Sequence, residues 1–376
     1  MSDVKDHRTA GAAETVRPRT PGELAAALRS TSGTVLPVGG GTKMGWAAAG
    51  EPADLLIHTG GLDTVVEYAP GDLVVVAEAG VPLAALQDQL AEQGQMLALD
   101  PPEPGATLGG IVSANASGPR RLRYGTVRDL LIGVTVVLAD GTVAKSGGKV
   151  VKNVAGYDLG KLYTGAHGSL GIVTSTTWRL HPLQPAMRAV RIPITDAIHA
   201  GRLAALIARS TLTPTAVELR WASSDRELVV VYESTPASVD AQSETTIEMI
   251  GGGAATDTTP DWFGARPTGD LVLRIAFAPY DLPHVLTALP PEASGMASAC
   301  TGVGYFALPP DTDLNALRAA IGRFDGSAVV ISSPGSPLPA EEHWGPISDS
   351  FELMTRLKDR FDPGRRLSPG RLLGGL

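Results

Sequence analysis

The sequence has almost no cysteine. Cys300 is the one cysteine in 376 residues, so this chain alone can form no internal disulfide and no cysteine cluster for zinc or iron–sulfur. If the protein passes electrons to an iron–sulfur centre, another chain must supply that centre.

The chain also lacks a basic block and a long apolar run. Its 31 Lys and Arg are outnumbered by 39 Asp and Glu, for a net charge of -8. Binding to nucleic acid needs clustered basic residues, so nucleic acid is excluded as the main partner. The longest apolar runs, such as Leu130–Ala139, are far shorter than a membrane span.

The first residues, 1–14, are polar and are predicted to be a flexible tail. They contain no apolar segment typical of a signal peptide. We therefore expect a cytoplasmic location, with peripheral contact with the inner membrane through a partner left open.

Glycine, by contrast, is abundant, with 44 residues. Many of them lie between Asp100 and Val173, next to small polar residues such as Thr107, Ser113 and Asn115. Small residues allow a backbone to approach another group closely. Core packing does not require this pattern, so we interpret the stretch as the wall of a cofactor site.

The first glycine loop runs from Gly39 to Lys43, directly after a predicted strand at Val35–Val38. Successive glycines can turn several backbone N–H groups toward one anion, and a diphosphate is a common occupant. The spacing matches neither the Walker loop nor the Rossmann fingerprint. A plain glycine turn between strands is an equally compatible interpretation.

A short helix is predicted at Leu108–Asn115, with Thr107 as its cap and Gly109 and Gly110 in its first turn. Glycine lowers helix stability by roughly 1 kcal/mol per residue. Close approach of a ligand to the positive helix end would offset this loss. Pro101, in the proline-rich segment before the helix, excludes helix and central strand there.

Two further groups are ambiguous. Arg120, Arg121, Arg123 and Tyr124 lie within 118–125, where a solvated basic loop is the commoner meaning. His167 lies among the glycines of a second glycine loop, 165–171, and a loop role is commoner there than a catalytic one.

The second half of the chain has a different pattern. Residues 186–345 alternate predicted strands and helices with long connections, which is typical of an α+β domain on an antiparallel sheet. An amphipathic helix at Ile347–Phe361 then precedes two Pro/Gly turns.

Several motifs occur together in a fixed order. They are Gly39–Thr42, Asp72–Leu83, Thr107–Gly110, Arg123–Gly125, Gly156–Leu159, Gly168–Ile172 and a terminal F-D-P-G with P-G-R. In this order the chain resembles the vanillyl-alcohol oxidase / p-cresol methylhydroxylase (PCMH) type of FAD-binding oxidoreductases. Within that family it is most similar to the small FAD-binding subunits of glycolate oxidases, on its length, Lys152–Leu159 and the Phe361–Arg371 ending.

The resemblance implies an α+β fold with a two-lobed PCMH-type FAD-binding domain at 15–185. It implies a cap domain with an antiparallel sheet at 186–345, and a segment, 346–376, that returns to the FAD domain. FAD is expected to be non-covalent, because the first loop offers Thr42 and Lys43 where some relatives carry a tethering histidine.

The implied function is an FAD-dependent oxidoreductase acting on CH–OH groups, with a 2-hydroxy acid as substrate. The implied partners are a larger flavin subunit and an iron–sulfur subunit. A stand-alone oxidase or dehydrogenase of a hydroxy acid or sugar alcohol, and a non-catalytic flavin-holding subunit, remain alternatives.

The resemblance also implies a set of cofactor-binding residues: Gly39, Gly40, Gly41, Thr42, Lys43, Pro101, Thr107, Gly109, Gly110, Ser113, Asn115, Gly118, Arg123, Tyr124, Gly125, Gly171, Ile172 and Val173. The catalytic residues are not assigned. Arg274 could bind a substrate carboxylate, although a surface arginine is the commoner meaning, and His343 is the second candidate. No metal is expected, since the histidines after residue 185 have no neighbour at metal-ligand spacing.

Overall fold

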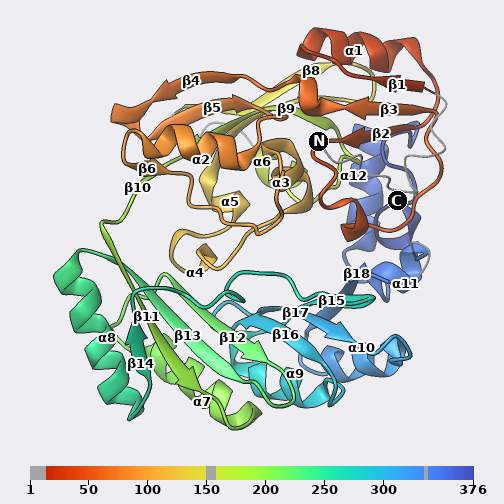
Figure 1. The fold of residues 1–376 in the computed structure, drawn as a ribbon. Helices are drawn as coiled ribbons and strands as arrows, with labels where there is room; N and C mark the ends of the chain where they lie inside the picture. Colours follow the sequence, from red (N-terminus) through yellow and green to blue (C-terminus); the bar gives the residue numbers. More distant parts are fainter. Residues whose placement is uncertain (1–13, 150–157, 334–337) are drawn as a thin grey trace. The chain divides into compact units, whose positions relative to one another are not determined.

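The computed structural model describes residues 14–149, 158–333 and 338–376 (Figure 1). Two compact units account for them. The first takes the described parts of Met1–Ser117, Thr126–Leu183 and Pro337–Leu376, and the second takes those of Gly118–Gly125 and Gln184–Ser336. Most of the Lys152–Leu159 segment and residues 1–13 of the predicted tail lie outside the described residues. Glu14 does not belong to a tail, because it begins strand β1.

The first unit contains three sheets among its described residues. A parallel sheet has the order β1 (Glu14–Val16), β3 (Leu55–His58), β2 (Val35–Val38). An antiparallel sheet has the order β4 (Val65–Ala69), β5 (Val74–Glu78), β9 (Ile172–Arg179), β7 (Leu131–Val137), β8 (Val143–Gly147). Strands β6 (Gln95–Met96) and β10 (His181–Pro182) form a small ladder.

Helices connect and cover these sheets. They are α1 (Pro21–Ser30), α2 (Leu83–Ala91), α3 (Leu108–Ala114), α5 (Val127–Leu130), α6 (Leu159–Tyr163), α11 (Ala340–Trp344) and α12 (Phe351–Phe361). Short 3₁₀ turns are η1 (Met44–Trp46), η2 (Thr59–Gly61), η3 (Pro70–Asp72) and η5 (Leu373–Gly375). Thr20 caps α1, since its hydroxyl accepts the Glu23 N–H at 3.1 Å.

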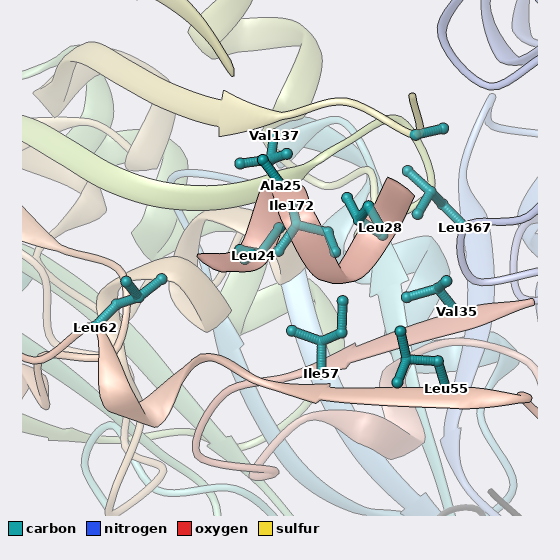
Figure 2. Close-up of a cluster of buried hydrophobic side chains, with 11 residues drawn as sticks. Leu24, Ala25, Leu28, Val35, Leu55, Ile57, Leu62, Val137, Ile172 and Leu367 are labelled. Atoms are coloured by element: carbon teal, nitrogen blue, oxygen red, sulfur yellow. The ribbon is translucent and has the colours of Figure 1, made fainter. Parts of the chain in front are cut away.

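The core beneath α1 holds the parallel sheet in place. Leu24 and Leu28 are four residues apart and therefore lie on one helix face. They pack over Val35, Leu55 and Ile57 of the strands (Figure 2). Fully burying one such side chain contributes about 1.5–3 kcal/mol. The cluster also includes Ala25, Leu62, Val137, Ala139, Ile172 and Leu367.

The C-terminal segment is part of this unit. Val35 N–H donates to Arg366 O at 2.8 Å, and Ser368 N–H donates back to Val35 O at 2.8 Å. The Arg366 guanidinium donates to Leu28 O and Gly33 O, at the end of α1. The backbone of residues 366–368 thereby pairs with the edge strand β2.

The second unit is built on an antiparallel sheet, which confirms the predicted α+β class with an antiparallel second sheet. Eight described strands follow the order β14 (Ala254–Thr256), β11 (Ala186–Pro193), β13 (Glu227–Ser234), β12 (Ala216–Trp221), β16 (Ser294–Ser298), β17 (Val303–Leu308), β15 (Leu271–Ala276), β18 (Ser327–Ser332). Strand β14 is an edge strand, paired with β11.

Helices α7 (Ala197–Arg209), α9 (Leu282–Ala288) and α10 (Leu314–Gly322) lie along one side of that sheet (Figure 1). Helix α8 (Pro236–Ile250) packs on β11 and β13, and the unit also holds α4 (Arg121–Tyr124) and η4 (Pro279–Asp281). No helix in the described part of the chain has the length and apolarity needed to cross a membrane.

Candidate cofactor site

A cavity in the first unit gathers the glycine-rich segments. It has about 700 Å³ of empty space, including the part that is open to solvent. Eleven of the residues that line it are expected cofactor-binding residues: Gly39, Gly40, Gly41, Thr42, Lys43, Thr107, Gly109, Gly110, Ser113, Ile172 and Val173. The residues that were not predicted are Leu36, Pro37, Val38, Met44, Thr59, Ala114, His167, Gly168 and Arg371.

The first glycine loop is tightly packed against the segment before α3. A side chain at Gly39 would collide with the Thr107 hydroxyl, and one at Gly40 would collide with the Gly105 carbonyl. Gly41 has φ +71°, a conformation that side chains disfavour. The loop therefore needs glycine for close packing within the protein as well as for its turn.

Thr107 carries the clearest sign of a ligand. Thr107 is 6% exposed, and its Oγ1 has no hydrogen-bond partner among the described residues. The predicted cap is wrong in this respect: Thr107 occupies the cap position of α3, but its hydroxyl makes no cap hydrogen bond. A buried hydroxyl without a partner costs about 1–3 kcal/mol, so this one fits a polar group bound in the cavity.

The start of α3 corrects a second expectation. Leu108 N–H donates to Val81 O at 3.0 Å, and Gly109 N–H donates to Ala79 O at 2.7 Å. A side chain at Gly109 would lie 2.7 Å from the Ala79 side chain. Gly109 is thus required for packing against the end of β5, and these two N–H groups are bound within the protein rather than turned toward a ligand.

A buried ion pair fixes the far end of the glycine loop. Lys43 Nζ lies 3.1 Å from Glu103 Oε2, with the side chains 6% and 13% exposed. The ammonium also lies 5.8 Å from the Trp46 ring centroid. The pair links the glycine loop to the proline-rich segment. Removal of either residue would leave the other charge buried without this counter-ion.

The second glycine loop forms another wall and brings in His167. This residue has φ +49°, its N–H donates to Ser113 O at 2.9 Å, and its ring is 5.7 Å from that of Trp344. Its neighbour Gly168 approaches Pro37, where a side chain would lie 2.5 Å from the proline ring. The sequence favours a loop role for His167 over a catalytic one. The glycines on either side of it are the sequence feature that could have predicted its place in this wall.

Arg371 reaches the cavity from the end of the chain. It is 4% exposed, and its Nη2 donates to Met44 O at 2.7 Å. The terminal P-G-R motif pointed to the segment, but no sequence pattern assigned this arginine to the site.

Three predicted residues of the first unit lie outside the cavity lining. Pro101 is half-buried in the proline-rich segment. Asn115 ends α3 with φ +49°, and its buried Oδ1 has no partner among the described residues. Gly171 gives room to Tyr163, whose ring would lie 3.2 Å from a side chain at 171; burial raises the pKa of Tyr163 to about 12.

Four other predicted residues, Gly118, Arg123, Tyr124 and Gly125, belong to the second unit. Arg123 Nη1 donates to Thr213 O at 3.2 Å. Burial raises the pKa of the Tyr124 hydroxyl, and the charge of Glu233 adds to this rise. Gly118 lines a smaller pocket on the second unit's sheet, and Gly125 ends α4 with φ +83°.

The two catalytic candidates lie in different units. Arg274 is half-buried on β15, opposite Tyr305 and Val329 of the neighbouring strands. His343 is 3% exposed on α11, with its ring 5.0 Å from that of Trp344. His343 does not line the cavity described above. Within the described residues, no three His, Cys, Asp or Glu side chains are grouped so that they could hold a metal ion.

Comparison with known proteins identifies the ligand class of the cavity. Residues 12–147 match the family described as FAD binding domain. This part of the chain is therefore similar to FAD-binding domains. The match covers the first glycine loop and α3, whereas the second glycine loop and Arg371 lie beyond it.

Two curated relatives are similar to part of this chain. Glycolate oxidase subunit GlcE of Escherichia coli (strain K12) is 38% identical over 150 residues, which are 39% of this chain and 42% of that protein. D-lactate dehydrogenase of Archaeoglobus fulgidus is 32% identical over 249 residues, which are 60% of this chain and 55% of that protein. The chain thus spans about half the length of these relatives.

The fold is shared with a solved structure of alkyldihydroxyacetonephosphate synthase. The two align with a TM-score of 0.70 at 16% identity, covering 95% of this chain and 77% of that one. At this identity the likeness concerns the fold alone.

The residues present fit FAD. The cavity combines a buried hydroxyl that needs a partner, small residues that allow close approach, and the cationic Arg371. The predicted cofactor, FAD, is confirmed by the domain match.

Proposed function

We propose that this protein is an FAD-dependent oxidoreductase that acts on the CH–OH group of a 2-hydroxy acid. Its specific role would be the FAD-binding subunit of a glycolate-oxidase complex. The observation that carries the proposal is the cavity at Thr107, where a buried hydroxyl faces the first glycine loop of an FAD-binding domain. Glycolate and D-lactate, in the names of the two relatives, are both 2-hydroxy acids.

The chain's own residues would bind and orient the cofactor. The loop Gly39–Lys43 would hold the diphosphate through backbone N–H groups, and Thr107, Gly110 and Ser113 would line the adjoining wall. Ile172 and Val173 would contact the adenine end. Bound FAD would be the acceptor of the electrons removed from the alcohol carbon.

The loop holds no histidine near Thr42 and Lys43, and Lys43 is engaged by Glu103. We therefore propose that FAD is held without a covalent bond. Arg274 is the proposed substrate residue, since a guanidinium can bind a carboxylate through two parallel hydrogen bonds.

The partners remain part of the proposal. The proposed partners are a larger flavin subunit and an iron–sulfur subunit, and the iron–sulfur subunit would receive the electrons. The sequence itself has one cysteine, too few for an iron–sulfur cluster. Any contact with the inner membrane would come through them. A stand-alone dehydrogenase is the second candidate, favoured by the longer alignment with the D-lactate dehydrogenase.

Anaerobic reduction of the purified chain tests these alternatives. The chain loaded with FAD is mixed with glycolate, D-lactate or a sugar alcohol, and flavin absorbance is followed; acetate, which lacks the hydroxyl, is the control. Bleaching of the isolated chain supports the stand-alone enzyme. Bleaching only after a larger flavin subunit is added supports the complex.

Other outcomes contradict the proposal. FAD binding without bleaching in either preparation would leave the chain as a non-catalytic flavin holder. A colourless chain that cannot be loaded with FAD would overturn every alternative.

A further inference from the structure

Arg371 is a buried cation on the wall of the FAD cavity. It lies between α12 and the 3₁₀ turn η5, outside the segment that matches the FAD binding domain family. Its sequence separation from Met44, whose carbonyl it binds, is 327 residues. Arg371 is 4% exposed, and an arginine is rarely so deeply buried.

The arginine is held in place by its backbone and by the shape of its surroundings. Its carbonyl accepts from Ala48 N–H at 3.1 Å and from Trp344 Nε1 at 2.9 Å. Gly50 makes room for its stem: a side chain there would lie 2.7 Å from Arg371 Cγ, and Gly50 has φ +70°. The guanidinium is therefore positioned before any ligand binds.

The first glycine loop places a second cation on the same wall. Lys43 Nζ is engaged by the Glu103 carboxylate at 3.1 Å, which makes a pair without net charge. Arg371 adds a permanently charged group with five N–H donors in a planar fork. Such a fork can bind a phosphate oxygen while it also holds a carbonyl.

We propose that Arg371 binds the diphosphate of FAD through its guanidinium. The C-terminal segment thereby completes the cofactor site begun by the glycine loop. This inference rests on FAD binding alone, so it is independent of the substrate and partners proposed above.

Titration of the apoprotein with FAD at several NaCl concentrations tests the proposal. Loss of a hydrogen bond to a charged group weakens binding about ten- to a hundredfold, so Arg371→Met should raise Kd for FAD by this factor. Because salt screens the attraction between charges, log Kd should also depend less on log[NaCl] in Arg371→Met than in the parent protein. Arg371→Lys should keep most of the salt dependence with a smaller loss of affinity.

Arg360→Met is the matched control, since Arg360 is an exposed arginine of α12. It should leave both Kd and its salt dependence unchanged. An Arg371→Met protein with parental Kd, or with a raised Kd but unchanged salt dependence, would show that Arg371 only braces the loop at Met44. Failure of both Arg371→Met and Arg371→Lys to fold as apoproteins, judged by circular dichroism, would overturn the proposal in favour of a structural role.

Discussion

The hydroxyl of Thr107 should have opposite effects on stability and on FAD binding. Thr107→Val replaces the hydroxyl by a methyl group of similar size, and the extended backbone at this position (φ -95°, ψ 154°) suits a β-branched residue. Because the buried Oγ1 has no partner among the described residues, its removal should raise the free energy of unfolding of the apoprotein, by up to about 1–3 kcal/mol. If FAD provides the missing partner, the same change removes about 0.5–1.5 kcal/mol of binding, or two- to tenfold in Kd.

Urea unfolding of the apoprotein and titration with FAD measure the two effects. Thr174→Val is the matched control, because Thr174 is fully buried and its Oγ1 already donates to Thr135 O at 3.1 Å. That variant should lose about 1 kcal/mol of stability with little change in FAD affinity. A Thr107→Val apoprotein that is less stable than the parent, with unchanged Kd for FAD, would refute the assignment of this hydroxyl to the cofactor.

Three further predictions concern groups that do not line the cavity. Lys358→Met should destabilise the protein by about 3–5 kcal/mol in urea unfolding, because it leaves the buried Asp362 carboxylate unpaired, whereas Lys161→Met, at an exposed pair, should cost less than about 1 kcal/mol. Equal effects of the two variants would contradict this contrast. The His199 N–H lowers the pKa of Asp196 from 3.8, so the charge of Asp196 stabilises the fold above pH 3.8 and this contribution is lost as pH falls through the lowered pKa. Asp196→Asn should therefore unfold at a lower urea concentration than the parent at pH 7, and the difference should shrink as pH falls below 3.8; a constant difference would be inconsistent with this assignment. Burial raises the pKa of Cys300 to about 12, so a disulfide reagent at pH 8 should label it only in urea, and rapid labelling of the native protein would contradict this.

Much of the fold could be predicted from local sequence patterns. Strand Val35–Val38 has the predicted bounds, since a short apolar run next to glycines is a strong local signal. The antiparallel sheet of the second unit followed from alternating strands and helices. Its edge strand β14 could not be predicted, because Ala254–Thr256 has no apolar alternation and is defined by pairing with β11.

The candidate site was predictable where glycine marks it. Both glycine loops and α3 line the cavity, but the reasons differ from those expected for Thr107 and Gly109. A threonine before a helix predicts a cap from local spacing, and only the three-dimensional packing against Gly39 shows its hydroxyl directed elsewhere. Glycine in a first helical turn likewise cannot reveal whether it faces a ligand or, as Gly109 does, the strand end at Ala79.

Lys358 shows why the remaining features need contacts between distant segments. A lysine four residues before an aspartate in an amphipathic helix normally indicates an exposed pair worth a few tenths of a kcal/mol. Lys358 is instead 1% exposed, because its Nζ also donates to Ser169 O and Leu367 O, each at 2.8 Å. Ser169 lies 189 residues earlier, in the second glycine loop. The local pattern is the same for a surface pair and for this buried one, and only the two carbonyl acceptors make burial of the charge possible. The same helix therefore joins the C-terminal segment to a wall of the FAD cavity, and the contrast between Lys358→Met and Lys161→Met measures the strength of that connection.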